Sequence, residues 1–197
     1  MLKKEFVYLF ILDSYFKKRT RFTQKEISEY LNISLSTVNN ALKPLEKMHA
    51  IEIKSREFIL RDFEKILVYW ATLRDIQKDI VYSTFYPDKT EKIEALMPNE
   101  VYFTGYSGYK ILEEIAPADY GEIYFYSDNL KEIKQRFPKR EGPKNIIVLK
   151  EENLLKKFSK NNIVPLPLIF VDLWNLPEWY AKDFLEDIKK KVKFKWY

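Results

Sequence analysis

The spacing of hydrophobic residues changes near residue 81 and divides the chain into two regions. Up to residue 80, apolar residues recur mostly at three- and four-residue steps, the period of helices. One exception is a short alternation at Ile51 and Ile53, followed after a polar turn by Phe58, which predicts a small β-hairpin. Beyond residue 81, short apolar runs alternate with helical stretches, which favours a sheet covered by helices. We therefore predict one domain at residues 1–80 and an α/β domain at residues 81–197.

Three helices are predicted before the hairpin. The first, at residues 3–18, is apolar on most of its faces, so we expect it to be buried on more than one side. A capping box then places Thr23 as the N-cap and Glu26 three residues later, and the short helix that follows ends near Asn32. After a tight turn, Ser34 begins a third helix. Its inward stripe is formed by Val38, Ala41, Leu42, Leu45 and Met48.

Small polar side chains open this third helix on faces away from the inward stripe. Two helices joined by a short turn, with hydroxyl and amide residues at the start of the second, are typical of a helix-turn-helix. Asn39 and Asn40 are each suited to a bidentate contact with adenine. We favour Asn40 because it lies one turn beyond Ser36 and Thr37 on the same face. Solvated helix surface remains the alternative for both asparagines.

Basic residues around the two helices and the hairpin are candidates for phosphate contacts, which set the register of a protein on DNA. Residues 1–80 carry fifteen Lys or Arg against eleven Asp or Glu, whereas residues 81–197 carry nineteen against eighteen. The positive excess therefore lies in the region with the helix-turn-helix pattern, which favours a DNA partner. The third helix has no arginine, so we expect weak readout of guanine. The candidate DNA-binding residues are Thr23, Gln24, Lys25, Ser34, Ser36, Thr37, Asn39, Asn40, Lys43, Lys47, Lys54 and Arg56.

A resemblance to the winged-helix regulators of bacteria and archaea is carried by the segment Thr23-Gln-Lys-Glu-Ile-Ser-Glu-Tyr-Leu-Asn-Ile-Ser-Leu-Ser-Thr-Val-Asn-Asn-Ala-Leu. With the hairpin, it covers roughly residues 20–62 and implies an α+β winged-helix domain that binds DNA. A winged helix that mediates only protein contacts is the alternative. Pro44 is expected to kink the third helix. His49 stands where relatives often have glycine, and we interpret it as an unusual C-cap rather than a catalytic base.

The second region is predicted to hold a four-strand sheet with packed helices. A helix at residues 63–78, capped by Asp62, leads to a linker at Tyr82–Lys89. Asp172 is expected to end the last strand, either bonding loop amides or contacting a partner. The predicted strands are Val101–Thr104, Glu122–Tyr126, Ile146–Leu149 and Leu166–Val171. The predicted helices are Thr90–Met97, Ser107–Ile115, Asn129–Phe137, Glu152–Ser159 and Glu178–Lys191.

Two segments of this region are similar to AbiEi-type antitoxins and their archaeal relatives. They are Val101-Tyr-Phe-Thr-Gly-Tyr-Ser-Gly-Tyr-Lys-Ile-Leu and Pro165-Leu-Pro-Leu-Ile-Phe-Val-Asp-Leu-Trp-Asn-Leu-Pro. The resemblance implies a repressor that regulates its own transcription, and it suggests a cognate toxin as a partner. Gly105 is expected to let the chain turn where a strand ends.

Few residues are available for catalysis. The chain has no cysteine and one histidine, which excludes thiolate chemistry and multi-histidine metal sites. Asp119 lacks the second carboxylate of a nucleotidyltransferase, and Tyr124 follows Glu122 where a restriction-type nuclease has lysine. We expect no catalytic residue, cofactor or metal. A nucleotidyltransferase-like or nuclease-like enzyme with a degenerate Asp119 and Glu122 site is the alternative.

Composition and charge agree with a regulator that acts in the cytoplasm. The chain has 197 residues, of which 46% are hydrophobic and 32% charged. Its apolar runs at Phe6–Leu12 and Ile163–Val171 are too short to span a bilayer, and no signal-peptide cleavage site follows the first of them. We predict a DNA-binding transcriptional regulator that binds double-stranded DNA as a homodimer through helices at residues 3–18 and 63–78.

Overall fold

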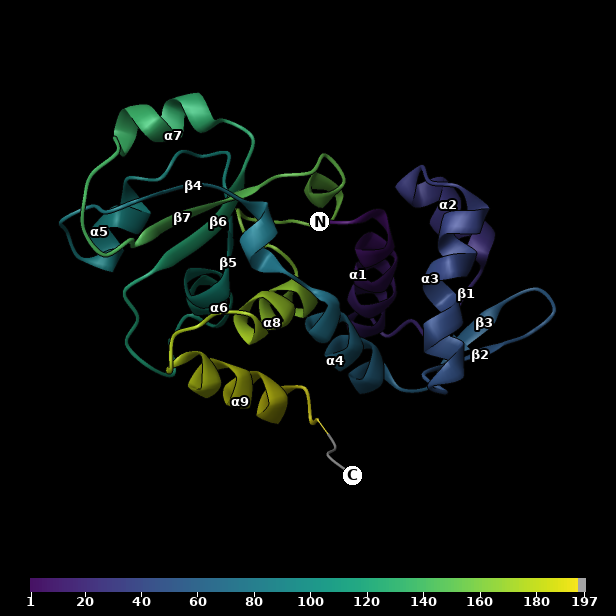
Figure 1. The fold of residues 1–197 in the computed structure, drawn as a ribbon. Helices are drawn as coiled ribbons and strands as arrows, with labels where there is room; N and C mark the ends of the chain where they lie inside the picture. Colours follow the sequence, from purple (N-terminus) through teal and green to yellow (C-terminus); the bar gives the residue numbers. More distant parts are fainter. Residues whose placement is uncertain (195–197) are drawn as a thin grey trace. The chain divides into compact units, whose positions relative to one another are not determined.

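The computed structural model describes residues 1–194, which form two compact units (Figure 1). The first unit is Met1–Leu73 and the second is Arg74–Phe194. The predicted second domain runs to residue 197, so its last three residues lie outside the described part of the chain.

The first unit is a winged helix, as predicted. Three helices precede a hairpin and a fourth helix follows it, with the three strands in the antiparallel order β1-β3-β2. The elements are α1 (Lys3–Phe16), β1 (Arg21–Phe22), α2 (Gln24–Leu31), α3 (Leu35–Lys47), β2 (Ile51–Ile53), β3 (Phe58–Leu60) and α4 (Phe63–Leu73). We call the β2–β3 hairpin the wing.

Local capping fixes the ends of the helix-turn-helix. The Thr23 hydroxyl accepts a hydrogen bond from the Glu26 amide at 3.1 Å, and the Ser34 hydroxyl accepts one from the Thr37 amide at 3.1 Å. Between the two helices Asn32 is left-handed, with φ of 51°. His49 is also left-handed, with φ of 57°, which confirms it as an unusual helix end. The predicted helix boundaries in this region follow from these caps.

The core of the first unit gathers around α1, which packs against α2, α3 and α4. Phe6 to Leu12 are all buried, as the apolar residues on most faces of α1 predict. The Trp70 indole donates to the Glu5 carboxylate at 3.0 Å, so a buried acid at the start of α1 is satisfied from α4. Phe22 stacks on Phe58 with ring centroids 5.4 Å apart, which ties β1 to the wing.

The second unit contains a four-strand mixed sheet in the order β4-β7-β6-β5. Only β6 and β7 are parallel; the two outer pairs are antiparallel. The strands are β4 (Ile80–Thr84), β5 (Tyr102–Thr104), β6 (Ile123–Ser127) and β7 (Ile146–Lys150). The helices are α5 (Thr90–Ala95), α6 (Gly105–Glu113), α7 (Leu130–Arg136), α8 (Leu166–Trp174) and α9 (Ala181–Lys191), with 3₁₀ turns at Ile76–Asp79 and Leu155–Lys157.

Helices cover both faces of this sheet (Figure 1). On β6, Ile123 and Phe125 join a core with residues of α5 and α7. The alternate residues Tyr124 and Tyr126 face the other side, where their hydroxyls reach Glu178 at 3.0 Å and Asp172 at 2.7 Å. The predicted sheet with packed helices is therefore confirmed.

The identity of one strand was wrong in the sequence-based prediction. The segment Leu166–Val171 is not a strand but part of α8. The fourth strand is Ile80–Thr84, which begins just after the predicted helix and overlaps the predicted linker. A short apolar run buried on all sides has no period that separates helix from strand. Pro167 sits at the start of α8, where a helix needs no amide donor, so it does not break the helix.

Other boundaries also differ. The helix expected at residues 63–78 ends at Leu73, although Asp62 caps it as predicted by accepting from the Lys65 amide at 3.0 Å. The helix expected at Glu152–Ser159 is reduced to a single 3₁₀ turn. Gly105 has φ of 57° where β5 gives way to α6, which confirms its predicted role at the strand end.

Asp172 lies inside α8, fully buried, rather than at a strand end. Its carboxylate accepts from the Arg74 guanidinium at 3.1 Å and from the hydroxyls of Thr104 and Tyr126, each at 2.7 Å. Arg74 also donates to Tyr126 at 3.0 Å and to Asp79 at 2.5 Å. The network joins the first residue of the second unit to two strands and α8, so the predicted loop or partner role for Asp172 was wrong.

Replacing Asp172 with Ala is expected to destabilise the second unit by about 3–5 kcal/mol, because a buried guanidinium loses its carboxylate. Chemical denaturation of the full chain measures this loss. Glu186→Ala, which removes an exposed carboxylate of α9, is the control and should change stability by less than about 0.5 kcal/mol. Equal stabilities of the two variants would show that the network contributes nothing.

Candidate nucleic-acid interface

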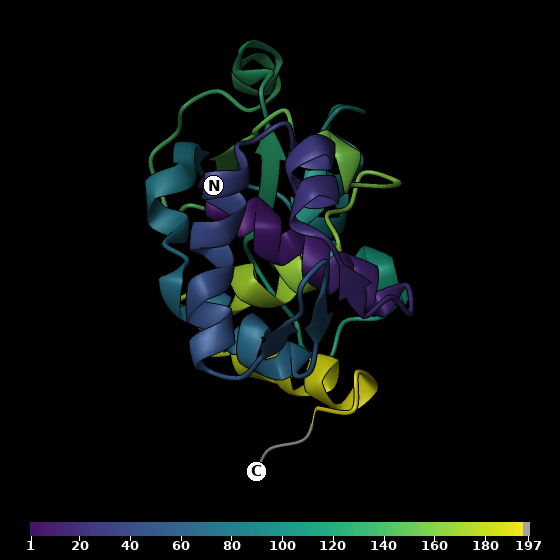
Figure 2. The same ribbon diagram turned by 90° about the vertical axis from the view of Figure 1, so that its right-hand side faces the viewer.

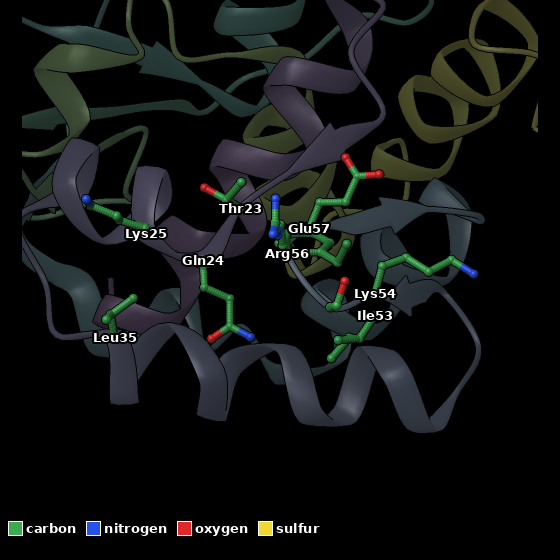
Figure 3. Close-up of a pocket in the computed structure, with 10 residues that line it drawn as sticks. Thr23, Gln24, Lys25, Leu35, Ile53, Lys54, Arg56 and Glu57 are labelled. Atoms are coloured by element: carbon green, nitrogen blue, oxygen red, sulfur yellow. The ribbon is translucent and has the colours of Figure 1, made fainter.

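A groove of about 270 Å³ opens between the start of α2, the start of α3 and the wing (Figure 3). Figure 2 views the first unit from the side on which α3 and the wing lie. Five of the twelve predicted site residues line the groove, so the fold brings residues far apart in sequence to one place. The predicted residues outside its lining are Ser34, Ser36, Thr37, Asn39, Asn40, Lys43 and Lys47. The lining residues are Thr23, Gln24, Lys25, Leu35, Ile53, Lys54, Ser55, Arg56, Glu57 and Phe58.

Hydroxyl groups at the start of α3 serve the helix itself. The Ser34 hydroxyl caps the helix and lies 2.8 Å from the Thr37 hydroxyl. Thr23 has the same capping role in α2. Ser36 is exposed on the first turn of α3. Ser36 is therefore the hydroxyl of this set that is best placed for a new hydrogen bond, whereas Thr23 and Ser34 position the helices.

The two asparagines of α3 have different surroundings. Asn39 is half-buried, and its amide nitrogen lies 3.5 Å from the side-chain oxygen of Gln24, which extends from α2 toward α3 (Figure 3). Asn40 is exposed, and its oxygen accepts from the Lys43 ammonium at 3.0 Å. Asn40 is therefore the more exposed of the two asparagines, and its amide oxygen is shared with Lys43.

The basic residues of the predicted site are all exposed: Lys25, Lys43, Lys47, Lys54 and Arg56. Lys25 has a distant partner in Glu29, at 3.8 Å. Lys54 and Arg61 both bind the Glu52 carboxylate, and the hydrogen bond from Lys54, followed by that from Arg61, lowers the pKa of Glu52 to about 2. Glu52 therefore stays charged and offsets part of the positive charge of the wing.

Sequence reasoning missed two apolar residues of the groove. Leu35 is 52% exposed at the first position of α3, and Ile53 is 37% exposed at the end of β2. Leu35 precedes Val38 by three residues, and Ile53 follows Ile51 by two, so both spacings predict burial with the core. The first turn of α3 and the end of β2 both extend beyond the core. The periodic pattern of apolar residues does not show where the core ends.

Both carboxylates of the alternative enzyme lie in the connection between α6 and β6. Asp119 is exposed in the connection after α6, and the Glu122 carboxylate accepts a hydrogen bond from the Tyr180 hydroxyl. Within residues 1–194, no three Asp, Glu or His side chains converge as metal ligands would. Among the described helices, none combines the length and the apolar character needed to cross a bilayer.

Comparison with known families bears on the function of the first unit. Residues 9–68 match the Crp-like helix-turn-helix domain. The match to the Crp-like helix-turn-helix domain runs from α1 through α2, α3 and the wing into α4, so it contains the whole groove. It supports a DNA-binding transcriptional regulator. Neither a curated protein nor a solved structure matches the chain.

If Lys43 neutralises a phosphate, Lys43→Ala should flatten the log–log dependence of DNA affinity on salt by about 0.9. Fluorescence anisotropy with a duplex at several salt concentrations measures the slope. Lys182→Ala, which removes an exposed lysine of α9, is the control and should leave the slope unchanged. An unaltered slope for Lys43→Ala would remove this residue from the interface.

Proposed function

We propose that this protein is a sequence-specific repressor that reads duplex DNA with the start of α3 and contacts the backbone with the wing. The observation that carries the proposal is the groove, which Leu35 at the start of α3 lines together with residues of the α2 start and the wing. The major groove of DNA admits a helix presented in this way, and exposed cations on α3 and on the wing supply phosphate contacts.

The side chains at the start of α3 favour A·T base pairs. An exposed asparagine amide, as in Asn40, matches the donor and acceptor pattern of adenine, and an exposed apolar side chain, as in Leu35, matches the thymine methyl group. The absence of arginine from α3 leaves lysine as the helix's only donor of the usual guanine contact, which weakens readout of guanine. We therefore propose an operator whose half-sites contain A·T pairs at the positions read by α3.

We further propose that the repressor binds as a homodimer in the cytoplasm. One short helix reads only a few base pairs, and helix-turn-helix proteins extend their sites by pairing two copies on half-sites one helical turn apart. The proposal includes no catalytic step: the Glu122 carboxylate accepts from the Tyr180 hydroxyl, and Asp119 is exposed in the connection before β6. Sedimentation of the free protein and of its DNA complex tests the stoichiometry.

The finer role of an autoregulating antitoxin is supported by the resemblance of the second region to AbiEi-type regulators. A mobility-shift experiment on the DNA upstream of the protein's own gene tests autoregulation. Adding the product of the neighbouring gene tests for a toxin that alters the complex. A shift on this DNA that random competitor does not remove supports the repressor, and no shift at any protein concentration contradicts autoregulation.

Asn40→Ala is expected to weaken binding to the specific site by roughly 1–3 kcal/mol while leaving binding to random DNA nearly unchanged, because only the base contact is lost. Competition anisotropy with both duplexes measures the two affinities. Asn39→Ala is the matched control and should have the smaller effect, because Asn39 is half-buried beside Gln24. A winged helix that contacts only protein would leave the wild-type chain without DNA affinity.

Leu35→Ala is expected to weaken the specific complex by about 1 kcal/mol through loss of an apolar contact to thymine. Replacing thymine by uracil removes the same methyl group, so it should weaken the wild-type complex but not the Leu35→Ala complex. Leu112→Ala, at an exposed leucine of α6, is the control. Additive losses from the protein and base changes would show that Leu35 does not touch the methyl group.

A further inference from the structure

The second unit has a basic surface of its own along α7 and the connection from α7 to β7. Residues 130–145 contain six Lys or Arg and two Glu. We define the α7 basic surface as Lys131, Lys134, Lys139, Arg140 and Lys144. This charge is concentrated in one segment, although residues 81–197 as a whole are nearly neutral.

The cations of the α7 basic surface differ from several exposed lysines of the unit in their partners. Lys78, Lys92 and Lys182 each pair with a carboxylate of their own segment, at 2.9, 3.3 and 3.7 Å. In the segment 130–145, Arg136 pairs with Glu132 at 2.6 Å. For the five members of the α7 basic surface, the described residues supply no carboxylate within 4.0 Å.

Four of these cations rest on uncharged groups instead. Lys139 donates to the Ser83 carbonyl at 2.9 Å, and Lys144 donates to the Arg140 carbonyl at 2.8 Å. Lys134 and Lys139 lie 5.5 and 5.6 Å from the ring centre of Tyr82, and Arg140 lies 5.4 Å from that of Tyr86. Such contacts orient a cation without neutralising it. The surface is therefore both positioned and charged.

The segment is held firmly against β4, the edge strand beside which α7 lies (Figure 1). The Tyr82 hydroxyl donates to the Phe137 carbonyl at 2.7 Å, and the Thr84 hydroxyl donates to the Pro138 carbonyl at 3.0 Å. The Arg140 amide donates back to the Thr84 hydroxyl at 2.9 Å. Because the backbone is already ordered, a ligand that binds here would lose little affinity to ordering of the chain.

The chemistry of the surface fits a phosphodiester backbone better than an acidic protein. Within residues 130–145, the large apolar side chains Leu130, Ile133 and Phe137 are not exposed. Protein interfaces have an apolar centre, whereas backbone contacts depend on cations and counterion release. We propose that the α7 basic surface is a second DNA-backbone contact of this regulator, in addition to the winged helix. The proposal rests on DNA binding by the chain but not on the operator or on repression.

The test uses the full chain with the winged-helix contacts weakened by Lys43→Ala, Lys47→Ala and Arg56→Ala. Into this background we place Lys131→Gln, Lys134→Gln and Arg140→Gln together. The matched control is Lys78→Gln, Lys92→Gln and Lys182→Gln, which removes the same charge from exposed lysines elsewhere in the unit. Anisotropy with a random-sequence duplex of about 30 bp at low salt measures binding, and thermal unfolding checks that each variant is folded.

We expect residual binding in the background variant and a loss of about tenfold or more when the α7 basic surface is neutralised, because each lost phosphate contact forgoes counterion release. The control should lose less than about twofold. Equal losses in both triple variants, or no residual binding to begin with, would overturn the proposal. A different result would assign the α7 basic surface to an acidic protein partner instead. In that result, neutralising the surface leaves duplex binding unaffected but abolishes binding of polyglutamate. None of these outcomes depends on the effect of Asn40→Ala, so the two proposals fail separately.

Discussion

The turn between α2 and α3 determines where the side chains of the proposed interface lie. Asn32 takes a left-handed conformation, and the Ser28 hydroxyl donates to the Ile33 carbonyl at 2.6 Å, so the chain reverses within a few residues. The Ser34 hydroxyl then caps α3. Because these polar bonds are local and the apolar stripes of both helices are buried, the first turn of α3 is presented in one fixed direction. The groove beside the wing follows from that direction.

The exposed cations of this protein differ in whether a carboxylate lies beside them. Lys54 and Arg61 are bound by Glu52, whereas Lys43, exposed on α3, donates to the neutral oxygen of Asn40 and has no carboxylate partner among residues 1–194. The same contrast separates the paired lysines of the second unit from the α7 basic surface. A cation without a carboxylate keeps its full electrostatic attraction for phosphate, so the pattern of pairing is more informative than the net charge of +5.

The second unit has a different kind of anchor. Arg74, its first residue, is buried with Asp172, and hydroxyls from β5 and β6 complete the bonds of that carboxylate. Breaking such a network leaves an unpaired charge in the protein interior. The network therefore favours one arrangement of the strands and α8, even where its net contribution to stability is small. Tyr124 and Tyr126 extend the same principle, since each buries a ring and places its hydroxyl on an acid.

The sequence by itself determined the winged helix, because its caps, turn and apolar steps are local features that act through neighbouring residues. It also determined that the second region forms a sheet with helices. Only the tertiary structure decided that Ile80–Thr84 is the fourth strand and Leu166–Trp174 a helix, since burial on every side erases the period that distinguishes them. The exposure of Leu35 and the pairing of Lys54 with Glu52 were likewise decided in three dimensions. The spacing of apolar residues shows which of them lie on the same face of a helix or strand. It does not show at which residue the core beneath that face ends.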